Sequence, residues 1–111
     1  MAASQDKIRR LINQYIQRLS ENNIPVQKVL LFGSYSKGNP GGDSDIDIAV
    51  VSSAFMGDRF SDRRHIVPLR RGIDSRIDPI PITPEDFFRG GVFIDEIKKT
   101  GQVVYSADQQ E

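Results

Sequence analysis

The sequence contains no cysteine, and this absence excludes several kinds of site at once. Disulfide frameworks, thiolate zinc sites and cysteine nucleophiles all require a thiol. A chain without cysteine suits a reducing compartment, so we expect a cytoplasmic protein. Histidine is nearly absent as well, and the single His65 is a poor candidate for a metal ligand or a base because no second histidine accompanies it.

The sequence also lacks an excess of either charge, because fifteen Lys and Arg balance fifteen Asp and Glu. No overall field would therefore hold the protein on nucleic acid or on an anionic membrane. No apolar run approaches the roughly 20 residues that cross a membrane, and the N-terminal segment lacks the apolar core of a signal peptide. With 111 residues of ordinary globular composition, we expect a single domain over 1–111 with one core.

The spacing of apolar residues predicts an α/β fold, a mixed β-sheet flanked by helices. Helices are predicted over 4–22, 58–71 and 92–99, with a short turn over 83–87; strands are predicted over 26–32, 45–51 and 75–82 and from 102 onward. Pro68 should kink or split the second helix. Pro79 and Pro81 cannot donate ladder hydrogen bonds, so the third strand is expected to lie at an edge of the sheet or to present that side to solvent.

The informative stretch is a glycine-rich loop followed by two acidic residues on a strand. Residues 33–44, GSYSKGNPGGDS, join two strands, and Asp45-Ile-Asp47 opens the second of them. Carboxylates at i and i+2 lie on one face of a strand, roughly 7 Å apart at Cα, while Ile46 faces the core. Gly33 leaves room for backbone to approach phosphate, and the Ser34 hydroxyl with successive N–H groups can cradle a triphosphate.

A third carboxylate from another strand would complete a cluster able to hold two magnesium ions, the geometry used for in-line nucleotidyl transfer. Asp78, within RIDPIPI, is the candidate if its strand lies beside DIDIAVV. A rival reading makes Asp78 a turn residue, with Asp74 or Asp86 filling the role. The residue before a proline favours extended geometry, which suits a strand.

Two other phosphate or metal motifs do not fit these residues. An EF-hand loop starting at Asp43 would place Ile48 where glycine is needed and Ala54 where glutamate is needed. GSYSKG is not a P-loop, because Lys37 precedes its glycine rather than following it.

Two groups of side chains have both structural and functional interpretations. Six of the ten arginines lie in 59–76, which is either a docking surface for an acidic or RNA partner or the solvated face of a helix. Tyr15 and Phe60 fall at helical spacing and are core candidates. Near the C-terminus the aromatic residues either wall a nucleobase or pack in the core: Phe87, Phe88 and Phe93.

The segment LLFGSYSKG…SDIDIAVV resembles the Gly-Ser, x(10), Asp-hydrophobic-Asp signature of the polymerase-β-like nucleotidyltransferase superfamily, in particular its minimal, stand-alone members. The resemblance implies the polymerase-β-like fold and transfer of a nucleoside monophosphate, most simply AMP from ATP, with release of pyrophosphate. It implies that Gly33 and Ser34 hold the triphosphate and that Asp45 and Asp47 bind two Mg²⁺ ions. It gives Asp78 the role of third acid, and Lys37 stands where the family often has an arginine near phosphate.

The resemblance also implies a partner. Minimal nucleotidyltransferases often accompany a small helical HEPN protein in toxin–antitoxin pairs, so the acceptor is expected to be such a partner rather than nucleic acid. An alternative is a non-catalytic, antitoxin-like binding subunit whose nucleotide site is vestigial. Stabilisation by Mg²⁺ with ATP would distinguish the enzyme from the binding subunit.

Overall fold

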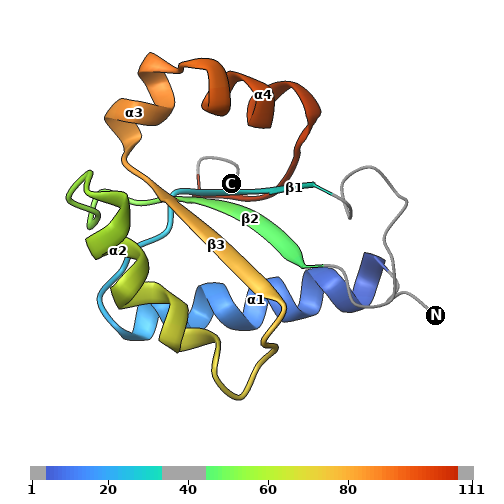
Figure 1. Cartoon of the computed structure of the whole chain (residues 1–111). Coiled ribbons are helices and arrows are strands. Elements are labelled where there is room, and N and C mark those ends of the chain that lie inside the picture. The colour runs from blue at the N-terminus through green and yellow to red at the C-terminus, as the bar shows by residue number, and fades with distance from the viewer. Residues whose placement is uncertain (1–4, 34–44, 108–111) are drawn as a thin grey trace.

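The computed structural model describes residues 5–33 and 45–107, which form a four-stranded mixed sheet with helices on both faces (Figure 1). The sheet order is β3-β2-β1-β4; β2 and β3 are parallel, and β1 is antiparallel to both β2 and β4. In chain order the elements are α1 (Gln5–Glu21), β1 (Lys28–Phe32), β2 (Ile46–Val51), α2 (Arg59–Ile66), the 3₁₀ helix η1 (Val67–Arg70), β3 (Ile77–Ile82), α3 (Pro84–Arg89), α4 (Val92–Thr100) and β4 (Gln102–Ser106). The predicted α/β fold is therefore confirmed.

The first face of the sheet is covered by α1, whose apolar stripe has the predicted helical spacing. The stripe packs on the side chains of β1 and β2 that point the same way, and all of these are buried: Ile8, Ile12, Tyr15, Ile16 and Leu19 against Val29, Leu31, Ile46, Ile48 and Val50. This is the larger of the two apolar clusters. The prediction that Tyr15 belongs to the core is correct.

The second face of the sheet is covered by α3 and α4, which lie on the opposite side from α1 (Figure 1). Its smaller core joins alternate residues of the strands to the buried side of α4: Leu30, Ala49, Val51, Ile82, Ile94 and Ile97. A helix forms over Pro84–Arg89 where only a short turn was predicted, because Thr83 caps it by accepting from the backbone N–H of Asp86. Most of the aromatic residues here are not core: Phe88 is 90% exposed and Phe93 is 44% exposed.

Helix α2 packs beside the edge strand β3 and ends where Pro68 predicts a break. The predicted helix over 58–71 is split into α2 and η1. Asp58 caps α2 through backbone N–H groups of Phe60 and Ser61. The prediction that Phe60 belongs to the core is wrong: its side chain is 72% exposed, because it lies on the side of α2 that faces away from the sheet's apolar clusters.

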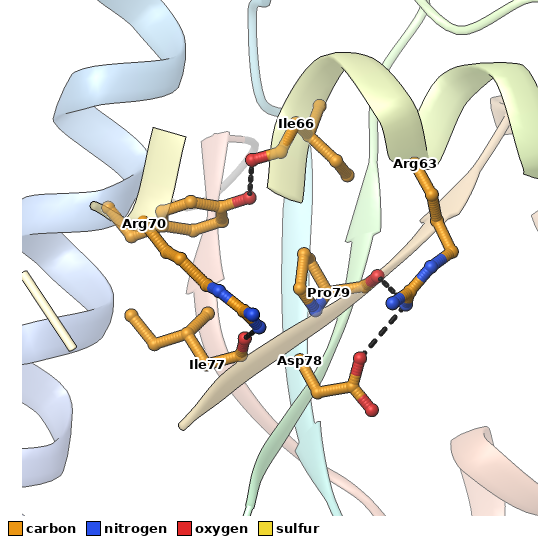
Figure 2. A network of polar contacts seen from close by, with 7 residues as sticks. Arg63, Ile66, Arg70, Ile77, Asp78 and Pro79 are labelled. Carbon is orange, nitrogen blue, oxygen red and sulfur yellow. Dashed lines mark hydrogen bonds and ion pairs between the residues drawn. The ribbon is translucent and has the colours of Figure 1, made fainter. Parts of the chain in front are cut away.

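The edge position of β3 is confirmed, and the prolines lie where the geometry requires. The backbone carbonyl of Arg76 accepts from the N–H of Ile46, and that of Ile82 accepts from the N–H of Ser52, directly after β2. The backbone polar groups of every second residue of β3 therefore face β2, and those of Pro79 and Pro81 face the open edge. Two outward carbonyls of this strand accept from arginines: Ile77 from Arg70 at 2.7 Å, and Pro79 from Arg63 at 2.7 Å (Figure 2). Among the described residues, no helix is long and apolar enough to span a membrane.

Candidate active site

Three carboxylates meet at the beginning of the two parallel strands. Asp47 and Asp78 are direct neighbours in the register of β2 and β3, and Asp45 immediately precedes β2. One carboxylate oxygen from each of the three lies within 4.8 Å of the other two. Among residues 5–33 and 45–107, no other cluster of three such groups occurs. The distances are compatible with a shared divalent cation.

The face on which this cluster lies follows from the alternation of β2. Ile46 and Ile48 are fully buried against α1, so Asp47 projects to the opposite face. On that face its antiparallel neighbour is Phe32, at the end of β1. Phe32 contacts Phe93 at the start of α4, with ring centroids 6.2 Å apart in an edge-to-face arrangement. The cluster thus lies on the sheet surface, close to the aromatic pair of Phe32 and Phe93.

The electrostatics of the cluster favour a bound cation. The pKa of the Asp47 carboxyl is raised to about 6, chiefly by burial, then by the negative charges of Asp78 and Asp45 and by a hydrogen bond with Asp78. A divalent cation would relieve this repulsion. The donor set is made only of carboxylate oxygens, which hard cations such as Mg²⁺ prefer. The residues present therefore fit the metal that the sequence predicts.

Gly33 has a role in this cluster that the sequence did not indicate. Its backbone has φ +74°, a conformation that favours glycine, and a Cβ built on it would lie 2.3 Å from Oδ2 of Asp47. A side chain at this position would therefore displace the Asp47 carboxylate. The glycine leaves room for the acid itself, in addition to the approach of phosphate that the motif predicts. Ser34 and Lys37, the other predicted nucleotide-binding residues, lie outside the described residues, as does Asp43.

The rival candidates for the third acid are engaged elsewhere. Asp74 forms an ion pair with Arg76 at 2.8 Å, and hydrogen bonds from that arginine hold the pKa of Asp74 below its ordinary value. Asp86 pairs with Arg89 within α3. Asp78 alone of the three candidates joins Asp45 and Asp47. His65 is exposed, with Nδ1 3.0 Å from the carbonyl oxygen of Ser61.

The arginine-rich segment 59–76 makes more specific contacts than either sequence interpretation proposed. Arg63 donates to Oδ1 of Asp78 at 2.9 Å, so it touches the third acid directly (Figure 2). The guanidinium of Arg59 lies over the ring of Phe93, 5.4 Å from its centroid. Phe93 in turn contacts Phe32, the neighbour of Asp47 in the sheet. No sequence pattern pairs residues 63 and 78; the contact depends on how α2 packs along β3.

The C-terminal aromatic residues divide between the two ends of the sheet. The ring of Phe87 is close to two lysines, with Nζ of Lys28 and Nζ of Lys98 at 5.6 and 4.4 Å from its centroid. Lys28 begins β1, whereas Phe32 ends that strand beside Asp47, so Phe87 is at the far end from the acids. Phe93 is the one of the three predicted aromatics placed near the cluster.

Comparison with known proteins assigns the family. Residues 14–110 match the model of the family described as polymerase beta, nucleotidyltransferase. No curated protein sequence matches the chain. A candidate nucleotidyltransferase from Sulfolobus solfataricus has the same fold, with a TM-score of 0.68 at 19% identity over 95% of this chain and 86% of that one.

Two further solved structures are toxin–antitoxin complexes. One, with AMP-PNP, gives a TM-score of 0.58 at 24% identity, covering 91% of this chain and 75% of that one. The other, a variant of the pair MntA–HpeT, gives 0.59 at 27% identity, covering 88% and 74%. The mixed sheet and the family match together identify a nucleotidyltransferase domain. The chain belongs to the polymerase-β nucleotidyltransferase family, as a minimal nucleotidyltransferase domain.

Proposed function

We propose that this domain transfers a nucleoside monophosphate, AMP from ATP in the first instance, to a hydroxyl group of a partner protein. The observation that carries the proposal is the convergence of Asp45, Asp47 and Asp78 within 4.8 Å on one face of the sheet. Family membership supports the class of reaction, and the complex with AMP-PNP among similar structures supports an adenine nucleotide as donor.

The acids share the work of the proposed reaction. Asp45 and Asp47 would hold the two Mg²⁺ ions, and Asp78 would complete the site as the third acid. When bound, Mg²⁺ would supply a lower pKa for the attacking hydroxyl and neutralisation of charge on the leaving pyrophosphate. Gly33, Ser34 and Lys37 hold the triphosphate so that its α-phosphorus faces the acceptor. The acceptor oxygen bonds to that phosphorus, the bond to the pyrophosphate oxygen breaks, and the hydroxyl proton leaves through Asp78 or water beside it.

The proposed acceptor is a small helical protein of the HEPN type. Two of the similar structures are toxin–antitoxin complexes, which supports a protein partner for this domain as well. The balanced charge of the chain gives no support to nucleic acid as the acceptor. A small helical protein encoded beside this chain would therefore be the first acceptor to test.

The test is a labelling reaction with the purified chain, the small helical protein proposed as its partner, Mg²⁺ and ATP labelled at the α-phosphate. We expect label on the partner and release of unlabelled pyrophosphate, both abolished by Asp45→Asn or Asp47→Asn. The same reaction with the other three triphosphates gives the base preference. Absence of label from every triphosphate, while both proteins are folded and form a complex, would contradict an enzymatic role.

The second candidate, a non-catalytic antitoxin-like subunit, leads to a different result in the same experiment. It predicts that the double variant Asp45→Asn/Asp47→Asn still binds and silences its partner as the wild type does. It also predicts no rise in Tm with Mg²⁺ and ATP. The intact acid cluster favours the enzyme, because a binding subunit has no need for three repelling carboxylates on one face.

A further inference from the structure

Arg63 makes two hydrogen bonds that tie the third acid to the backbone of its own strand. Its Nη1 atom donates to Oδ1 of Asp78 at 2.9 Å and to the carbonyl oxygen of Pro79 at 2.7 Å (Figure 2). Pro79 faces the open edge of β3, so this carbonyl has no neighbouring strand to bind. The backbone fixes the guanidinium, and the guanidinium in turn fixes the carboxylate.

The helix that carries Arg63 is anchored on both sides of it. The buried carboxylate of Asp62 accepts from the backbone N–H groups of Met56 and Gly57 at 3.1 to 3.2 Å. Three residues after Arg63, the carbonyl of Ile66 accepts from the buried hydroxyl of Tyr15 at 2.6 Å. The backbone around Arg63 is therefore fixed by the contacts of Asp62 and Ile66, and its guanidinium is fixed by β3.

The chemistry of the cluster gives this contact a purpose. Asp78 would otherwise be repelled by Asp47 and Asp45, whose carboxylate oxygens lie within 4.8 Å of its own. An unrestrained aspartate relieves such repulsion by turning toward solvent, which would remove it from a shared metal site. A carboxylate can accept from an arginine and still offer lone pairs to a cation.

We propose that Arg63 is a positioning residue, which holds Asp78 in the geometry that a divalent cation needs before that cation arrives. The inference rests on the proposed function, since it gives Asp78 a place in the metal site. Partners of metal ligands commonly change metal affinity by about 10- to 100-fold when they are removed. Arg63 was assigned by sequence only to a docking or solvated surface.

Arg70 provides a matched control within the same structure. It too reaches from the α2–η1 segment to an outward carbonyl of β3, that of Ile77, at 2.7 Å. Neither Arg70 nor Ile77 belongs to the acid cluster, and the described residues show no ion pair from Arg70 to an acid. Arg70→Gln therefore removes an edge contact of the same kind without releasing Asp78.

The experiment is a titration of each protein with Mn²⁺ alone, followed by the electron paramagnetic resonance signal of the free ion. We expect Arg63→Gln to bind Mn²⁺ at least about 10-fold more weakly than the wild type, and Arg70→Gln to bind like the wild type. Arg63→Lys keeps the charge but is a less rigid donor, so an intermediate affinity is expected. Circular dichroism melts establish that each variant is folded.

The outcomes separate this inference from the proposed function. A wild type that binds Mn²⁺ and an Arg63→Gln variant that binds it equally well, or more tightly, would overturn the inference alone; tighter binding would show that Arg63 competes with the cation. A wild type that binds no Mn²⁺ would overturn the metal site itself and the inference with it. If Arg63→Gln does not fold, the Mn²⁺ affinity of Arg63→Lys is compared with that of Arg70→Gln instead. A wild-type affinity in Arg63→Lys would overturn the positioning role of the Arg63 guanidinium.

Discussion

Alternate residues of one short segment lie on the two faces of β2, and the two faces have different environments. Toward α1, Ile46 and Ile48 are fully buried in the larger core. On the other face, Asp45 and Asp47 gather with Asp78, and Asp47 has its pKa raised by burial and by its acidic neighbours. Burial of apolar side chains stabilises the face toward α1, whereas the opposite face brings together carboxylates that repel one another. The difference shows that residues one position apart on a strand can separate folding from binding chemistry.

The largest expected effect comes from placing charge on the wrong face. Ile46→Asp puts a carboxylate into a fully buried apolar site, at a cost of about 4 kcal/mol or more, comparable to the whole stability of a domain of this size. We expect the loss of cooperative urea unfolding. Asp47→Asn, one position along, should unfold cooperatively and serves as the control. An Ile46→Asp protein with the wild-type midpoint would remove the distinction between the faces.

Gly33→Ala should affect both stability and metal binding. The positive φ costs an alanine about 1 to 2 kcal/mol, and the added methyl would displace Oδ2 of Asp47. Gly72→Ala is the matched control, because Gly72 has φ +83° but no atom within 4 Å of the new Cβ. Both variants should lose similar stability in urea, and only Gly33→Ala should bind Mn²⁺ more weakly. Equal Mn²⁺ affinities would show that the carboxylate accommodates the methyl.

Tyr15→Phe tests a buried polar contact within the apolar face. The hydroxyl of Tyr15 donates to the carbonyl of Ile66, and burial raises the pKa of this tyrosine above its ordinary value. Removing it leaves a buried carbonyl without its donor, which should lower the free energy of unfolding by about 1 to 2 kcal/mol. The measurement is the urea midpoint, with Mn²⁺ affinity as the second readout. We expect Mn²⁺ affinity to change less than in Arg63→Gln, since Arg63 keeps both of its own contacts.

A separate expected effect is a pH dependence of stability without metal. Because the folded pKa of Asp47 is raised to about 6, the native state keeps a proton that the unfolded state has already released. Stability therefore falls as pH rises from about 4 to 6, and the loss is complete above this window. Asp47→Asn lacks this loss, so in EDTA it should be the more stable protein at pH 7 and lose the advantage near pH 4.

Adding Mg²⁺ in excess supplies the control for that comparison. The ion binds the native wild type and should reverse the order at pH 7, making the wild type more stable than Asp47→Asn. Unfolding curves at several pH values, with and without Mg²⁺, measure both effects. A wild type that gains stability on going from pH 4 to 7 relative to Asp47→Asn, in EDTA, would contradict the raised pKa.

Local pattern was enough to predict the architecture and the shared face of Asp45 and Asp47, whereas Asp78 was one of three candidates for the third acid until the structure placed it beside them. Alternation in DIDIAVV fixes which face each residue takes, and Pro79 and Pro81 restrict β3 to an edge. The roles of these acids in transfer remain predictions. Phe60 was misassigned because helical spacing shows which residues share a stripe but not whether anything covers that stripe. Arg63 was missed because its contact with Asp78 spans fifteen positions and depends on packing.

The edge of β3 also limits how copies of this protein can assemble. Pro79 and Pro81 present no N–H to the outside, the N–H of Ile77 is bound by the carbonyl of Asp74, and two outward carbonyls accept from arginines. An incoming strand from another chain finds no donor on this side, so the sheet cannot be extended there by strand addition or strand exchange. Lateral growth of the sheet is left to β4, at the opposite edge from the acids.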